Sequence, residues 1–400
     1  MNLEIDNSMS DRNSTKIEYD LRIEGDYYNH LDIEGFFLMM KNPSFCYKFY
    51  WLEAIVNLIS EDMTETTFDE VINEMIANAW YSVLEFHIHL SGIVLGEVKD
   101  GLERAVLKLS DISGLPANAS KVEIKNKIKE FDTELKAEKE QLTNMVPYRA
   151  LAGFFDKFDE TADWESTRRM IAYIERVNKV NILPYTLGNG SRLKKEIYFN
   201  SSWIKMIQDN TVSILGWIQF EKVKWLQNNN PEVPGLVYKL APMDEKMRKL
   251  NAVRKLWNAA LCIESVADVF TGKQIDIKKY DVDHFIPWSF VMNDELWNLM
   301  PMDSSLNSSK SNKLPEWDPF FIRFANNQFT LYKMIHDNDH PAIHKLFEAC
   351  YKDNMHSIWA NQELYRPGNS SEEFEHILEK NMRPVYDSAR RQGYELWKIS

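Results

Sequence analysis

Residues 281–315 constrain the fold of this chain most strongly, because two short apolar runs, each bounded by turn signals, are followed there by a helix signal. The run KKYDVDHFIP (278–287) predicts a strand that leads into a turn, and WNLMPM (297–302) predicts a second strand. Asp303 is a good N-cap for a helix that ends at Pro315. The segment therefore predicts the order strand, loop, strand, helix.

Four polar residues occupy fixed positions on that plan. Asp283 and His284 end the first strand, His284 lies fourteen positions before Asn298, and Asn298 lies nine before Asn307. Carboxylate and amide oxygens suit a hard divalent cation such as Mg²⁺ or Mn²⁺. A neutral imidazole titrates near physiological pH and can take a proton from water. If these side chains converge, they hold one cation and activate one water molecule.

The same window resembles the HNH nucleases, whose catalytic core is a ββα-metal fold. The matching residues are Asp283-His284, Ile286-Pro287, Asn298-Leu299, Asn307, Lys310-Ser311 and Leu314-Pro315. Asparagine in place of the last histidine makes this an HNN variant, similar to the HNH domain of RNA-guided CRISPR nucleases. The resemblance spans residues 270–317 of the 400.

The resemblance implies a role for each matching residue. His284 is then the general base, and Asn298 holds the loop that carries it. Asp283 and Asn307 are the protein ligands of one divalent metal ion, Mg²⁺ or Mn²⁺, which contacts the scissile phosphate. Basic residues on the helix contact nucleic acid; these are Lys310 and Lys313.

Cysteine usage separates this chain from many relatives, which frame the core with two CxxC zinc pairs. The three cysteines here form no such pair, so we expect neither a structural zinc nor a disulfide scaffold. The preceding helix and Trp288, Trp297 and Trp317 are expected to brace the core instead.

Charge is unevenly distributed along the chain. The net charge of −13 argues against a nucleic-acid partner, yet residues 190–257 hold twelve Lys or Arg against six Asp or Glu. This basic tract directly precedes the candidate site and predicts phosphate contacts. The residues expected to make them are Lys246, Arg248, Lys249, Arg254 and Lys255. Solvated helix faces explain the same tract equally well, because Lys and Arg usually lie on the surface.

Four hundred residues exceed what one hydrophobic core usually organises. We expect a mainly α protein with a small α+β portion. Its predicted regions are a helical N-terminal region (1–189), a basic region (190–256), the ββα-metal core (257–330) and a helical C-terminal region (331–400). The LGNGS stretch at 187–191 marks the first boundary, because such residues often form linkers or turns.

The sequence gives no sign of a membrane. No run approaches the roughly 18 apolar residues that span a bilayer, and the acidic, polar start of the chain lacks the apolar segment of a secretory signal. We therefore expect a cytoplasmic protein with no membrane partner.

Together these features predict a metal-dependent endonuclease that hydrolyses DNA phosphodiester bonds. Its domain architecture suggests a role in bacterial anti-phage defence or restriction. Residues 1–189 are expected to recognise a partner, such as a regulatory protein, or to regulate cutting. The alternative is a nucleic-acid-binding or partner-binding protein with a non-catalytic HNH fold. The chemistry of the site needs no 2′-hydroxyl, so it does not distinguish DNA from RNA.

Overall fold

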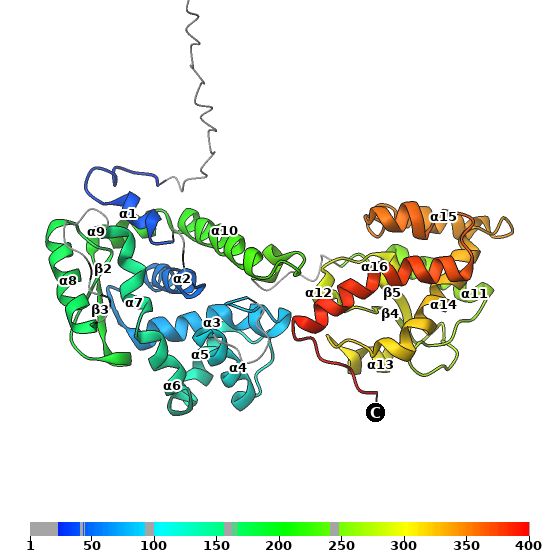
Figure 1. The fold of residues 1–400 in the computed structure, drawn as a ribbon, viewed down its shortest axis with the longest axis horizontal. Coiled ribbons are helices and arrows are strands. Elements are labelled where there is room, and N and C mark those ends of the chain that lie inside the picture. Colours follow the sequence, from blue (N-terminus) through cyan, green and yellow to red (C-terminus); the bar gives the residue numbers. More distant parts are fainter. Residues whose placement is uncertain are drawn as a thin grey trace, which may run out of the picture.

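The computed structural model describes residues 23–40, 43, 45–92, 100–155, 162, 164, 166–240 and 248–399. These residues form two lobes that lie side by side along the longest axis of the molecule (Figure 1). Each lobe has its own apolar core. The first core runs from Ile23 to Leu236 and the second from Val253 to Trp397. The protein is mainly helical, with small antiparallel sheets.

The first lobe surrounds a three-stranded antiparallel sheet of order β1–β3–β2 with helices. Its strands are β1 (Glu65–Thr67), β2 (Tyr185–Leu187) and β3 (Glu196–Phe199). Its described helices are α1 (Ile33–Leu38), α2 (Tyr47–Ser60), α3 (Phe68–Phe86), α4 (Gly101–Ser113), α5 (Lys121–Glu130), α6 (Asp132–Thr143), α7 (Val146–Arg149), α8 (Thr167–Val180), α9 (Ser201–Asp209) and α10 (Thr211–Asn229). Short 3₁₀ helices are η1 (Ala150–Phe154), η2 (Arg192–Lys194) and η3 (Leu236–Lys239).

The two cores divide the chain differently from the four predicted regions. Strands β2 and β3 pair with each other, so the turn at 187–191 joins two strands of one sheet. The described residues of the predicted basic region 190–256 contribute to both cores. Its first part packs in the first lobe, and its last part begins the helix α11 (Asn251–Ile263) of the second lobe.

The second lobe contains the predicted order of strand, loop, strand and helix. Strands β4 (Tyr280–His284) and β5 (Leu299–Asp303) pair antiparallel, with His284 opposite Leu299, and α13 (Ser304–Lys310) follows. The Asp303 side chain accepts a hydrogen bond from the Ser305 backbone N–H, so this residue caps α13 as predicted. The remaining elements are α11, α12 (Trp288–Val291), η5 (Leu296–Asn298), α14 (Trp317–Ile335), α15 (Pro341–Cys350), the π-helical turn η6 (Ala360–Leu364) and α16 (Ser371–Arg391).

Aromatic packing supports the small sheet. Trp297 and Trp317 are buried in the second core, and Trp317 stacks on Phe321 with ring centroids 4.3 Å apart. Trp288 is only half-buried, and its ring lies 4.9 Å from the guanidinium carbon of Arg248. Two of the three expected tryptophans therefore brace the core, while the third contacts a residue of the basic tract.

The lobes meet at the C-terminal end of α3. Asn312 Nδ2 donates to Glu85 Oε1 at 2.6 Å, and the buried Lys239 Nζ donates to the Phe290 backbone oxygen at 2.7 Å. Burial lowers the pKa of Lys239 to about 7. Among the described residues, no helix combines the length and apolar character that crossing a bilayer requires.

Candidate functional site

Strand β4 presents the predicted residues on two faces, because successive side chains of a strand point to opposite sides. His284 lies on the buried face, and the partly exposed Asp283 lies on the other. Two residues that are neighbours in the sequence therefore contact different parts of the lobe.

The imidazole of His284 is held from both of its nitrogens. Nε2 lies 3.0 Å from Asp294 Oδ1 and 3.2 Å from the Asn293 backbone oxygen, while Nδ1 lies 3.4 Å from Arg248 Nη2. A guanidinium can only donate, so Nδ1 accepts and Nε2 carries the proton. The basic lone pair of His284 thus faces Arg248. The residue is 1% exposed, so this guanidinium and the core cover it.

The charge states of this cluster suit a base. Burial lowers the pKa of His284, the Asp294 hydrogen bond opposes this shift, and the Arg248 charge reinforces it. Burial alone would raise the pKa of Asp294, but hydrogen bonds from His284 and from the Lys249 backbone N–H lower it overall. At neutral pH the pair is a neutral imidazole beside a carboxylate. That is the protonation state from which a general base acts.

Asn298 fixes the chain directly after His284. This fully buried residue accepts from the Ile286 backbone N–H through Oδ1 and donates to the Ile286 oxygen through Nδ2, both at 2.8 Å. Its own backbone oxygen accepts from Phe285 N at 2.8 Å. Because both polar groups of Ile286 are satisfied by one side chain, the turn after β4 has a defined conformation.

Lys310 occupies the other face of β4. Its ammonium donates to Asp283 Oδ2 at 2.8 Å and to the His284 backbone oxygen at 2.7 Å, and the residue is fully buried. The sequence predicts a phosphate contact for Lys310. Here the ammonium neutralises Asp283 and does not reach the surface, because α13 packs against β4.

Asn307 lies one helical turn before Lys310 and faces the carboxylate of Asp281, which was not among the predicted metal ligands. Its Nδ2 is 3.4 Å from Asp281 Oδ2, and Arg254 Nη2 is 3.7 Å from Asp281 Oδ1. Asp281 shares the face of Asp283, because the two are separated by one residue in a strand. The Asp-Val-Asp spacing was the signal that could have identified it.

The oxygen donors on this face fit a hard divalent cation. Asp281, Asp283 and Asn307 offer carboxylate and amide oxygens, which Mg²⁺ and Mn²⁺ prefer over the nitrogen and sulfur ligands typical of zinc. Within the described part of the chain, no three His, Cys, Asp or Glu side chains form a group that could hold a metal ion. A metal here would therefore keep water or phosphate oxygens among its ligands, and it would compete with Lys310 for Asp283.

The contacts do not gather the imidazole and these oxygens around one point. The link between the two faces is Lys310, which contacts the Asp283 side chain and the His284 backbone. Convergence of His284, Asp283 and Asn307 on one cation stays a prediction. It requires the ion pair between Lys310 and Asp283 to break.

Two arginines of the basic tract lie beside β4. Arg248 Nε is 3.2 Å from Asp294 Oδ1, and Arg254 lies 5.8 Å from the Tyr280 ring. Other predicted phosphate contacts have exposed side chains; these are Lys249, Lys255 and Lys313. Lys246 lies outside the described residues.

Two antiparallel strands followed by a helix, with a histidine at the end of the first strand and an asparagine on the helix, have the form of a ββα nuclease core. Residues 268–316 match the family model described as HNH endonuclease. The chain therefore carries an HNH endonuclease domain, in the part of the second lobe that holds β4, β5 and α13. No curated protein and no solved structure matches the chain.

Proposed function

We propose that this protein is a metal-dependent endonuclease that hydrolyses phosphodiester bonds of DNA. The observation that carries the proposal is the coincidence of the HNH endonuclease match with a neutral His284 whose Nε2–H is held by Asp294 and the Asn293 oxygen. This arrangement leaves Nδ1 as the proton acceptor.

Each residue then has a chemical task. His284 Nδ1 takes a proton from the attacking water, and Asn298 keeps the imidazole in place through Ile286. Asp283 and Asn307, with Asp281 beside them, would hold one Mg²⁺ or Mn²⁺, which stabilises the charge that develops on the phosphate and the leaving oxygen. The expected products carry 5′-phosphate and 3′-hydroxyl ends.

Substrate binding would open the cluster around His284. Arg248 donates to Nδ1, where the water must bind, and the bond of 3.4 Å is long. A phosphate is a stronger partner for a guanidinium than a neutral imidazole, because the bond is charge-assisted and can be bidentate. DNA that draws Arg248 outward would therefore uncover the base. Lys249, Arg254 and Lys255 lie on the same segment and would add phosphate contacts.

The test is cleavage of supercoiled plasmid with Mg²⁺ or Mn²⁺ by the wild type, His284→Ala and Asn307→Ala. Loss of a general base lowers the rate by about 10²–10⁴-fold, while DNA affinity should stay within about twofold because His284 is buried and is not one of the proposed phosphate contacts. His344→Ala, which alters a largely exposed histidine in α15, is the matched control and should cleave as the wild type does. Cleavage by His284→Ala at the wild-type rate would reject the assignment. A single-stranded RNA of the same sequence tests the choice of DNA.

A second candidate is a nucleic-acid-binding protein with a non-catalytic HNH fold. It is favoured by the closed arrangement, in which His284 is covered and Lys310 neutralises Asp283. DNA binding by the wild type without cleavage under either metal would support this candidate.

For the endonuclease, we propose a role in anti-phage defence or restriction. Protection of bacteria from phage by the wild type, and its loss with His284→Ala, tests that role.

A further inference from the structure

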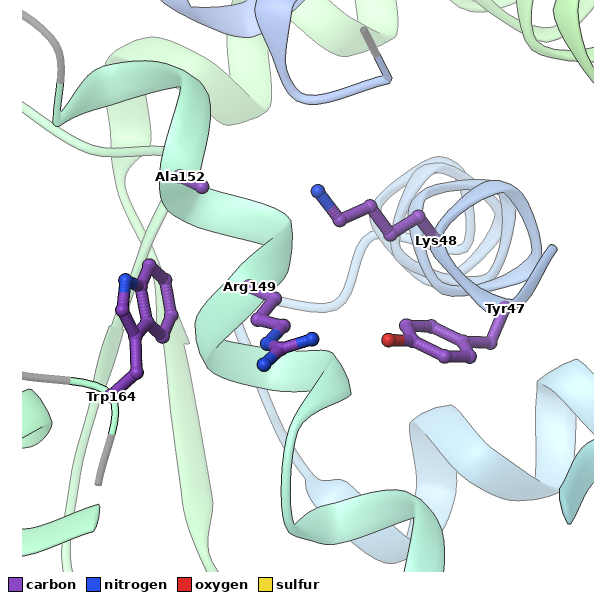
Figure 2. A pocket seen from close by; sticks show the side chains of 5 residues that line it. All are labelled: Tyr47, Lys48, Arg149, Ala152 and Trp164. Atoms are coloured by element: carbon purple, nitrogen blue, oxygen red, sulfur yellow. The ribbon is translucent and has the colours of Figure 1, made fainter. Parts of the chain in front are cut away.

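A cavity of about 150 Å³ lies in the first lobe, between α2 and the segment formed by α7 and η1. Its lining residues are Tyr47, Lys48, Arg149, Ala152 and Trp164. Figure 2 shows the Lys48 ammonium, the Arg149 guanidinium and the Tyr47 hydroxyl directed into the same space. The cavity therefore gathers two cationic groups and one hydroxyl.

These two cations have no acidic partner in the part of the chain that the structure describes. Among the described residues, no ion pair involves Lys48 or Arg149. Two buried lysines of the same lobe behave differently: Lys222 pairs with Glu53 at 2.9 Å and Lys139 pairs with Asp132 at 2.6 Å. Because no described carboxylate pairs with Lys48 or Arg149, an external anion is a suitable partner for the two cations.

The two cations at the cavity repel each other. Burial and then the Arg149 charge lower the pKa of Lys48, because the two cations repel each other in a partly dehydrated space. Burial raises the pKa of Tyr47, so its hydroxyl remains protonated and able to donate. The Lys48 ammonium, the Arg149 guanidinium and the Tyr47 hydroxyl can thus all donate into the same volume. An oxyanion satisfies all three with charge-assisted hydrogen bonds.

We propose that this cavity binds the phosphate monoester group of a ligand such as a 5′-nucleotide. A monoester carries up to two negative charges, which match the two cations, and its oxygens suit the planar fork of Arg149. A volume of about 150 Å³ holds a phosphate group, whereas pockets that enclose whole drug-sized ligands have roughly 300–1,000 Å³. Trp164, 38% exposed with its ring 5.8 Å from the Arg149 guanidinium carbon, offers a planar apolar surface to the organic part.

This site is independent of the nuclease proposal, since it lies in the other lobe and shares no residue with the HNH domain. The same phosphate chemistry has two possible sources: a free nucleotide and the 5′-phosphorylated end of a nucleic acid. Both present a terminal monoester, which a phosphodiester inside a DNA strand lacks.

The experiment is calorimetric titration of the full chain with inorganic phosphate, AMP and adenosine, and with one DNA oligonucleotide with and without a 5′-phosphate. We expect inorganic phosphate and the probes with a phosphate monoester to bind, and each monoester to bind at least tenfold more tightly than its unphosphorylated counterpart. Arg149→Gln and Lys48→Gln should each weaken this binding by about tenfold or more, since each removes a charge-assisted bond. Arg192→Gln is the matched control, because Arg192 is 71% exposed and pairs with Glu140. It should bind as the wild type does.

Thermal unfolding separates a binding role from a structural one. Phosphate or AMP should raise the midpoint of the wild type and of Arg192→Gln, but not that of Arg149→Gln or Lys48→Gln. Without ligand, both cavity variants should be at least as stable as the wild type, because each removes a repulsion. If Arg149→Gln fails to fold, Arg149→Lys keeps the charge without the fork, and binding should still weaken.

Preference for AMP assigns the site to free nucleotides, and preference for the phosphorylated oligonucleotide assigns it to nucleic-acid ends. Equal affinity for the phosphorylated and unphosphorylated probes would overturn the proposal. So would wild-type affinity in both cavity variants, or the absence of saturable binding by every monoester.

Discussion

Cationic side chains pair with carboxylates in the HNH domain, whereas those at the first-lobe cavity have no such partner among the described residues. In the HNH domain Lys310 lies 2.8 Å from Asp283, and Arg248 lies 3.2 Å from Asp294. In the cavity Lys48 and Arg149 have no ion-pair partner among the described residues. A paired cation keeps a site closed until a metal or a phosphate displaces it, whereas an unpaired cation leaves a site ready for an anion. The comparison predicts how each region responds when one charge is removed.

The largest effect is expected from Asp294→Asn, which makes the His284 cluster resemble the cavity by leaving Arg248 unpaired. Asp294 is 5% exposed and contacts Arg248, His284 and the Lys249 backbone N–H. Loss of the Asp294 negative charge should lower the free energy of unfolding by about 2–4 kcal/mol, because the donors around it lose a charged acceptor. Urea unfolding measures this. The exposed Asp111→Asn should change little, and an equally small change for Asp294→Asn would show that the pairing is weak.

Lys239 is a third case, a fully buried lysine whose acceptor is neutral: it donates to a backbone oxygen at the junction of the lobes. Its pKa is about 7 in the folded protein, against about 10.4 for an unfolded chain. Between these values the unfolded chain binds the extra proton, so stability rises with pH. From pH 7 to 9 this residue should add roughly 2 kcal/mol to the free energy of unfolding.

The check is chemical unfolding at pH 7 and 9, for the wild type and Lys239→Met. The variant should lose most of the rise. Lys222→Met removes a lysine that is equally buried but paired with Glu53, and it should lower stability by a similar amount at both pH values. An unchanged pH dependence in Lys239→Met would mean that Lys239 stays protonated at the junction.

Lys310→Met should make Asp283 more available to metal. A divalent cation must displace the Lys310 ammonium from Asp283 in the wild type, so the variant is expected to bind Mn²⁺ about tenfold more tightly. Thermal unfolding at increasing Mn²⁺ concentration gives the apparent affinity. Lys313→Met, on an exposed residue three positions later, should match the wild type. Weaker Mn²⁺ binding by Lys310→Met would contradict competition at Asp283.

The smallest effect concerns the exposed Lys255, which has no role in closing the HNH domain. If it contacts a DNA phosphate, Lys255→Gln should reduce the slope of log affinity against log salt by about 0.9. Fluorescence anisotropy of a labelled duplex at several salt concentrations measures the slope. Lys194→Gln alters an exposed lysine of the first lobe and serves as the control. Identical slopes for both variants would remove Lys255 from the interface.

Local signals explain the parts that could be predicted from the sequence. The order β4, β5, α13 and the Asp303 cap follow from strand alternation, turn residues and capping chemistry, each of which spans a few residues. The turn at 187–191 shows the limit of such signals. Glycine and asparagine favour a linker and a hairpin turn alike, and only the pairing of β2 with β3 distinguishes them.

Non-local packing explains what the sequence did not reveal. Arg248 reaches His284 across 36 positions, and Lys310 reaches Asp283 across 27. Residue type and spacing marked Lys310 as a basic residue near the site, but only the packing of α13 on β4 shows that it is buried against a carboxylate. The cavity of Lys48 and Arg149 has no local signature, because its two cations come from separate helices.

The position of Lys310 also ties the HNH domain to a distant part of the chain. Trp397 Nε1 donates to Ser309 Oγ at 2.9 Å, and its backbone N–H donates to the Leu314 oxygen at 2.7 Å. The segment around Trp397 is thus anchored on the last turn of α13, which is the turn that Lys310 fastens to β4. An ion that takes Asp283 from Lys310 would loosen that turn, and the indole of Trp397 could report metal loading through its fluorescence.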